Sequence, residues 1–235
     1  MALPSVGAIG TNLTSGSGTS AAPAVPSGVV SGSFVAFGMF LDGSAQTVTA
    51  PDGTWTEAEG SPINVSGGSH GLHVFYHRAT GTESGNYGNF TWGSSTYRSG
   101  FTTRFVDVLA SGTPFDSPTG AAESNSILTT TPAVSTTSAD VDRLDVFFAT
   151  NWSGGTWTAP ATFTKQREGT DQVMVLCTHD HPTAGSTGSL VAVCTGADRS
   201  TAWVGALIGT TGAATAAPRG ALVVPRLATV QAGVW

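Results

Sequence analysis

The chain has very few charged residues. Among 235 residues only 10% are Asp, Glu, Lys or Arg, against about 25% in an average soluble domain. Lys165 is the only lysine, and the formal net charge is −6. Binding to nucleic-acid phosphates needs clustered Lys and Arg. The composition therefore predicts no nucleic-acid partner.

Long hydrophobic runs are also missing. The longest apolar stretch, residues 34–41, is too short to cross a bilayer. Residues 1–30 lack the charged region and the unbroken apolar region of a secretory signal. We therefore expect neither a membrane partner nor a secretory leader.

Helical periodicity is absent from every segment of a dozen residues, and 31 glycines supply turns. Alternation is clear instead: Phe101, Thr103 and Phe105 share one strand face, and Thr102 and Arg104 share the other. The sequence predicts an all-β protein. Strand-like runs occur at residues 28–30, 33–41, 46–49, 54–57, 71–78, 87–92, 97–108, 127–134, 143–150, 156–158, 163–168, 172–179, 188–195 and 201–208.

The sequence of the body contains an internal repeat. Residues 23–25, Pro-Ala-Val, recur at 132–134, a shift of 109 residues, and at this shift residues 49–51 match 158–160 and residues 59–60 match 168–169. Apolar Val35 and Phe37 then fall on Leu144 and Val146, and further along the shift drops to 101. Shared turn chemistry in a Thr-, Ala- and Pro-rich chain is the alternative, but we favour a true duplication.

This pattern divides the chain into three parts. We expect an extended N-terminal arm over residues 1–22, a duplicated body over 23–209 with repeats at about 22–109 and 130–209, and a C-terminal linker and apolar arm over 210–235. A β unit of one repeat's length has a marginal core of its own. We therefore predict one jelly-roll-like antiparallel β-sandwich built from both halves, with two small sandwiches joined by residues 114–126 as the alternative.

The sequence offers little that points to catalysis. It contains no phosphate loop, dinucleotide-binding fingerprint or His-Glu-x-x-His. The acidic residues lie mostly at expected turns and strand ends, where carboxylates usually face water. We expect no enzyme activity, no catalytic residue and no cofactor.

The two cysteines and the last two histidines form one candidate metal site. Cys177, His179 and His181 alternate along a strand, and Cys194 lies on the expected neighbouring strand. A zinc site would need all four groups to converge on one point, and a cross-strand disulfide is a second interpretation. The third, which we favour, is that both cysteines are small apolar core residues.

Two tryptophans flank a Gly-containing loop at residues 151–157. Exposed tryptophans in β-sandwiches stack on sugar rings, so Trp152 and Trp157 are candidate glycan contacts. The alternative, which we favour, is that they close the ends of the sandwich core.

The C-terminal residues are apolar and punctuated by proline. We expect them either to return to the same sandwich or to lie on a neighbouring subunit as an assembly arm. Such an arm would bury the large apolar side chains Leu222, Val223, Val224, Leu227 and Trp235.

Four segments of the chain resemble structural proteins of tailed phages of high-GC actinobacteria. They are residues 23–34 (Pro-Ala-Val-Pro-Ser-Gly-Val-Val-Ser-Gly-Ser-Phe), residues 49–56 (Thr-Ala-Pro-Asp-Gly-Thr-Trp-Thr), and the later Thr-Thr-Pro-Ala-Val and Asn-Trp-Ser-Gly-Gly-Thr-Trp. The resemblance covers about residues 19–209 and rests on turn residues, so it transfers no catalytic residue. It implies a virion protein of the minor tail or capsid-surface type.

We therefore expect a structural component of a tailed-phage virion, assembled in the cytoplasm of the bacterial host. A minor tail protein is favoured over a capsid decoration protein, and a carbohydrate-binding module is a further alternative. The expected partners are copies of the chain itself, other virion proteins and, through the tryptophan loop, a host surface glycan.

Overall fold

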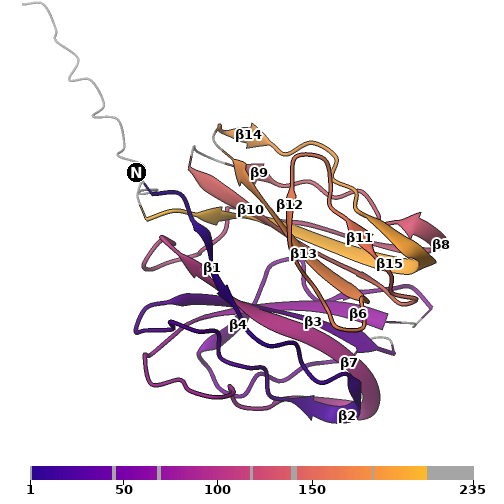
Figure 1. Ribbon diagram of the computed structural model, residues 1–235, viewed down its shortest axis with the longest axis horizontal. Helices are drawn as coiled ribbons and strands as arrows, with labels where there is room; N and C mark the ends of the chain where they lie inside the picture. Colours follow the sequence, from indigo (N-terminus) through magenta and orange to yellow (C-terminus); the bar gives the residue numbers. More distant parts are fainter. Residues whose placement is uncertain are drawn as a thin grey trace, which may run out of the picture.

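The computed structural model describes residues 2–43, 46–67, 70–116, 119–138, 142–181 and 183–210. Within these ranges every regular element is a β-strand. No helix in them is long and apolar enough to cross a membrane. Figure 1 shows two sheets packed face to face, the lower one indigo to magenta and the upper one pink to yellow.

The lower sheet takes all its strands from the first half of the chain. They pair in the order β1-β7-β3-β6-β4, while β2 also pairs with β7 and β5 with β6. All of these pairings are antiparallel. The strands are β1 (Ser5–Ile9), β2 (Gly16–Ala21), β3 (Phe34–Asp42), β4 (Trp55–Glu57), β5 (Ile63–Asn64), β6 (His70–Arg78) and β7 (Phe90–Val106).

The upper sheet takes its strands from the second half. They pair in the order β11-β15-β10-β13-β12, and β8 also pairs with β15. A separate pair, β9 (Thr137–Ser138) and β14 (Gly185–Ser186), lies beside this sheet. The strands of the sheet are β8 (Gly120–Thr130), β10 (Arg143–Asn151), β11 (Trp157–Thr158), β12 (Thr164–Glu168), β13 (Met174–His181) and β15 (Val193–Ile208).

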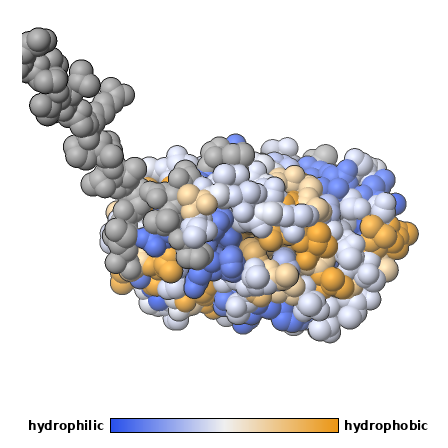
Figure 2. All heavy atoms as spheres, turned by 90° about the horizontal axis from the view of Figure 1, so that it is seen from above, coloured by the Kyte–Doolittle hydropathy of each residue, from blue (hydrophilic) through white to orange (hydrophobic). Residues whose placement is uncertain are grey.

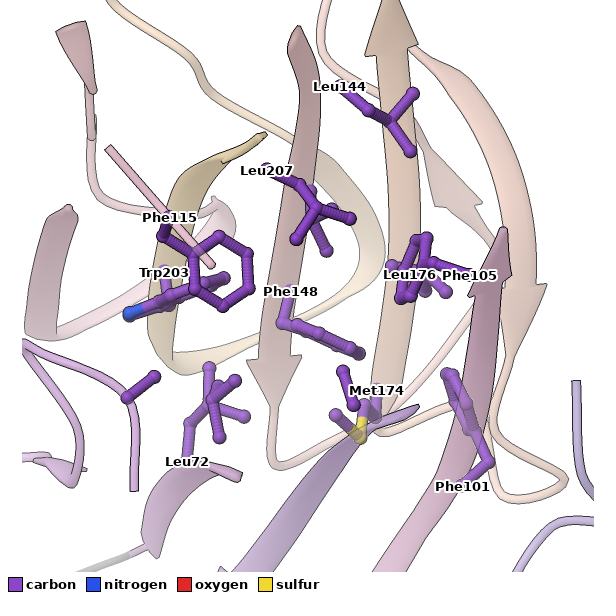
Figure 3. Close-up of a cluster of buried hydrophobic side chains, with 14 of the residues drawn as sticks. Leu72, Phe101, Phe105, Phe115, Leu144, Phe148, Met174, Leu176, Trp203 and Leu207 are labelled. Carbon is purple, nitrogen blue, oxygen red and sulfur yellow. The ribbon is translucent and has the colours of Figure 1, made fainter. Parts of the chain in front are cut away.

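A central apolar cluster joins the two sheets. Figure 3 shows Phe101, Phe105 and Leu72 of the lower sheet facing Phe148 and Leu176 of the upper one. Close contact between the sheets requires glycine at position 38, because a Cβ there would lie 2.4 Å from Met174 Cε and 2.6 Å from Phe148 Cε1. Burial of this shared surface makes the two halves one packed unit.

Each sheet also buries its outer face. On the lower sheet the cover is aromatic and includes Phe37, Trp55 and Phe90. On the upper sheet it consists mostly of small side chains around Trp157, such as Ala149 and Cys177. The central strands β3 and β10 are therefore buried on both faces, which explains their nearly continuous apolar sequences.

The predicted all-β sandwich is confirmed, whereas the jelly-roll connections are not, because each sheet comes from one half of the chain. The two sheets share a strand order, β7-β3-β6-β4 and β15-β10-β13-β12, as a duplication requires. The ungapped match of Val35 with Leu144 is not kept, however, since Val35 faces the outer cluster and Leu144 the central one. A shift of one residue reverses the face of a strand, so the duplication stays a prediction.

The prediction of a separate N-terminal arm over residues 1–22 is wrong for the described residues. β1 and β2 lie within this segment, and both pair with β7. Ala21 and Leu13 are buried in the outer cluster of the lower sheet. Backbone pairing orders this Gly- and Ser-rich segment although it has few apolar side chains to bury.

Candidate functional site

The predicted face of Cys177, His179 and His181 is present on the outer side of β13. His181 is the last residue of that strand, not part of a turn. Cys194 lies on β15, which is separated from β13 by β10. Both cysteines are free, so the disulfide interpretation is wrong.

Both thiols are core groups of the upper sheet. Cys177 and Cys194 belong to the outer cluster around Trp157. Burial raises the pKa of Cys177 to about 12 and raises that of Cys194 as well. Because the thiolate is the form that binds metals and attacks electrophiles, burial makes both groups poor ligands and nucleophiles. Among the residues that the structure describes, no group of three or more His, Cys, Asp or Glu side chains is placed to hold a metal ion.

The two histidines instead share one buried carboxylate, Asp145 of β10. His181 Nδ1 lies 3.1 Å from Asp145 Oδ1, and His179 Nδ1 lies 3.3 Å from Asp145 Oδ2. Burial raises the pKa of Asp145, while the hydrogen bonds and charges of the histidines act in the opposite direction. Phe163 stacks on His179 with ring centroids 5.2 Å apart. The group is a polar cluster within an apolar face, in which Asp145 is fully buried and the His179 side chain is 32% exposed.

Sequence reasoning missed Asp145. The available signal was a single carboxylate inside the apolar strand Leu144–Ala149, because a charge in a strand buried on both faces needs a partner. The identity of the partners depended on the pairing of β10 with β13, which places Asp145 opposite His179.

The lower sheet carries a second pair of outer-face histidines, on β6. His73 Nδ1 lies 3.0 Å from Glu57 Oε1, and Ser61 Oγ donates to the same oxygen at 2.9 Å. His77 stacks on Trp55 with centroids 4.5 Å apart. Since Ser61 contacts the carboxylate and not a histidine, these groups do not form the nucleophile–base arrangement that acyl transfer requires.

The two loop tryptophans occupy different environments. Trp157 is 2% exposed in the outer cluster of the upper sheet, and its Nε1 donates to the Gln172 carbonyl at 2.7 Å. The prediction of Trp157 as a glycan contact is therefore wrong. Trp152 is 36% exposed and stacks on Phe40 at 5.4 Å, so only one of the two candidate platforms reaches solvent.

Exposed apolar side chains gather at one end of the upper sheet. Of the five large apolar side chains that are exposed in the described residues, Ile127, Leu128 and Val193 lie on β8 and β15. We call residues 125–130 of β8 and 193–199 of β15 the β8–β15 ribbon. It lies at the right-hand end in Figure 1, and Figure 2 shows an apolar patch at that end of the molecule.

The ribbon includes an edge of the sheet. Within the described part of the chain β8 pairs only with β15. Positions 125–129 are exposed without interruption. Edge strands normally carry charges or proline that prevent further pairing, but β8 contains one charged residue, Glu123, and no proline. The ribbon is the candidate interaction surface of the protein.

The predicted arm residues Leu222, Val223, Val224, Leu227 and Trp235 lie outside the described residues. Comparisons of the chain with models of protein families, with curated proteins and with solved structures found no match.

Proposed function

We propose that the chain is a non-catalytic structural protein that acts by assembly, as a component of a tailed-phage virion. The observation that carries the assembly role is the concentration of three exposed large apolar side chains on the β8–β15 ribbon, where β8 forms an edge of the sheet within the described residues. Contiguous exposed apolar surface marks interaction sites, and an open edge adds backbone groups that another strand can satisfy.

The interior supports the same role. Polar side chains tie the two sheets together: Asp171 of the upper half accepts hydrogen bonds from Tyr97 at 2.7 Å and from Ser99 at 2.9 Å. Trp203 Nε1 donates to the Glu59 carbonyl at 2.9 Å. These groups hold the halves in a fixed orientation, which suits a rigid building block. The virion setting rests on the resemblance of residues 19–209 to actinobacteriophage structural proteins, and the tail is the favoured location.

Light scattering of the full chain tests the assembly role. We expect a homo-oligomer whose mass falls on dilution. A monomer at every concentration, both alone and with the other proteins of its virion, would contradict the proposal. In isolated particles the copy number separates the two locations, since a few copies per particle indicate the tail and hundreds indicate capsid decoration.

A further inference from the structure

We infer that the β8–β15 ribbon of one copy receives residues 221–230 of a second copy, which adds to β8 as an extra strand. This inference rests on the proposed assembly role and names the surface and the segment that carry it. The acceptor is the free edge of β8 beside Ile127 and Leu128, which are 68% and 47% exposed.

The chemistry of the two partners matches. Residues 221–230 read Ala-Leu-Val-Val-Pro-Arg-Leu-Ala-Thr-Val, and their β-branched side chains favour an extended strand. Ile127, Leu128 and Val193 provide apolar contacts, while the backbone of β8 provides hydrogen-bonding groups. Pro225 lacks an N–H group, so the segment fits an outermost strand and not an interior one.

Charge also favours the pairing. Residues 211–235 contain two arginines, Arg219 and Arg226, and no acidic residue, whereas the whole chain carries −6, so the remaining residues carry −8. Glu123, Asp198 and Arg199 lie on or beside the ribbon and together carry −1. A positively charged segment is therefore attracted to an acidic body, and the attraction weakens as salt increases.

Chain length favours a second copy over the same chain. Leu128 pairs with Asp198 of β15, and the strand continues from Asp198 to Ile208, a distance of about 33 Å at strand spacing. Ala221 follows Thr210 by eleven residues, which can span at most about 37 Å when the chain is fully extended. The connecting residues would have to be almost fully stretched for the segment to reach the ribbon of its own copy, which costs conformational entropy. The ribbon of a neighbouring copy can lie closer to Thr210, so that binding to it does not carry this cost.

Disulfide trapping between two proteins that each carry one introduced cysteine tests the inference. The full chain carrying Ile127→Cys is mixed with the full chain carrying Val223→Cys under mild oxidation. Native Cys177 and Cys194 are buried and stay in place. The matched control replaces Ile127→Cys by Val30→Cys, because Val30 is 62% exposed but lies outside the ribbon. We expect a cross-linked dimer from the first mixture and none from the control.

The other outcomes overturn the inference in distinguishable ways. Equal cross-linking of the control would show that the segment has no specific acceptor. A link that forms only within a chain carrying both substitutions would make the occupant the chain's own segment. Absence of any link in a protein that remains oligomeric would refute the ribbon as acceptor and leave the proposed assembly role standing, whereas a monomer would refute both.

A charge substitution on the ribbon gives an independent readout. Leu128→Lys should weaken self-association by about tenfold or more, because it places a charge in the buried contact. Val30→Lys should leave it unchanged. Circular dichroism identifies any variant that fails to fold, and equal association of both folded variants would contradict the inference.

Discussion

The outer faces of the two sheets are both buried, but by side chains of different sizes. The lower sheet covers β3 with large aromatic groups such as Phe37, Trp55 and Phe90. The upper sheet covers β10 with small groups such as Ala192, Ala202 and Cys194, and Trp157 is its largest member. The same strand order is therefore compatible with two kinds of core, provided that each fills its space.

The histidine pairs differ in a parallel way. In the lower sheet His73 and His77 lie near separate carboxylates, Glu57 at 3.0 Å and Glu83 at 3.7 Å. In the upper sheet His179 and His181 share the fully buried Asp145. One buried charge thus replaces two partly exposed ones. The upper face should depend more strongly on a single residue.

The largest effect should come from the aromatic cover. Phe90→Ala should lower the free energy of unfolding by about 4 kcal/mol, because it leaves a large cavity among rings. Val175→Ala in the upper cluster removes two buried carbons and should cost about 2 kcal/mol. Urea unfolding followed by tryptophan fluorescence measures both. A larger loss for Val175→Ala would reverse the comparison of the two covers.

The next largest difference between the two halves should be in how their contributions to the free energy of unfolding depend on pH. Burial lowers the pKa of His70 to about 4. The charge of Asp198 opposes this shift, and the charge of Arg199 adds to it. The unfolded chain, with an ordinary pKa near 6.5, then binds more protons than the folded one between these values. Stability should therefore fall by about 3 kcal/mol as the pH drops from about 6.5 to about 4.

Denaturant titrations at several pH values measure this slope. His70→Phe should flatten it, whatever its effect on stability at neutral pH, because phenylalanine does not titrate. His70 is the first residue of β6, whereas β13, which occupies the same place in the strand order of the upper sheet, begins at Met174, so no histidine lies at the corresponding strand end. An unchanged slope in the variant would assign the pH dependence to other groups.

The shared carboxylate should produce a smaller difference. Asp145→Ala removes the contact to both histidines in a buried site and should cost about 2 to 3 kcal/mol. Glu57→Ala should cost less, about 1 kcal/mol or below, because the Glu57 side chain is 30% exposed. Asp145→Asn, which keeps one acceptor, is the matched control and should fall between them. Equal losses for Asp145→Ala and Glu57→Ala would remove the distinction between the two pairs.

The smallest effect on folding should come from the ribbon. Ile127→Thr should change the free energy of unfolding by less than about 0.5 kcal/mol, because the side chain is exposed in the isolated body. Measurement of a dilute, unassembled sample checks this value. A loss comparable to that of Phe90→Ala would mean that Ile127 belongs to the core and not to an interaction surface.

Much of the strand pattern could be predicted from the sequence because it is local. Residues 33–41, 71–78, 143–150 and 163–168 were predicted as strands and correspond to β3, β6, β10 and β12. β1, β2 and most of β8 were missed. These strands lie at sheet edges and are rich in Gly, Ser and Ala, so they are ordered mainly by backbone pairing, which leaves little hydrophobic signal.

The sequence by itself determined the fold class, since alternating strands, abundant glycine and missing helical periodicity permit little else. Only the tertiary structure decided which face of each strand meets the other sheet. β3 and β10 are buried on both sides, so their side chains carry no alternation that distinguishes the faces. The partners of Asp145, the burial of Trp157 and the open edge of β8 all depend on that choice. They follow from strand pairing between distant segments, and local sequence does not encode such pairing.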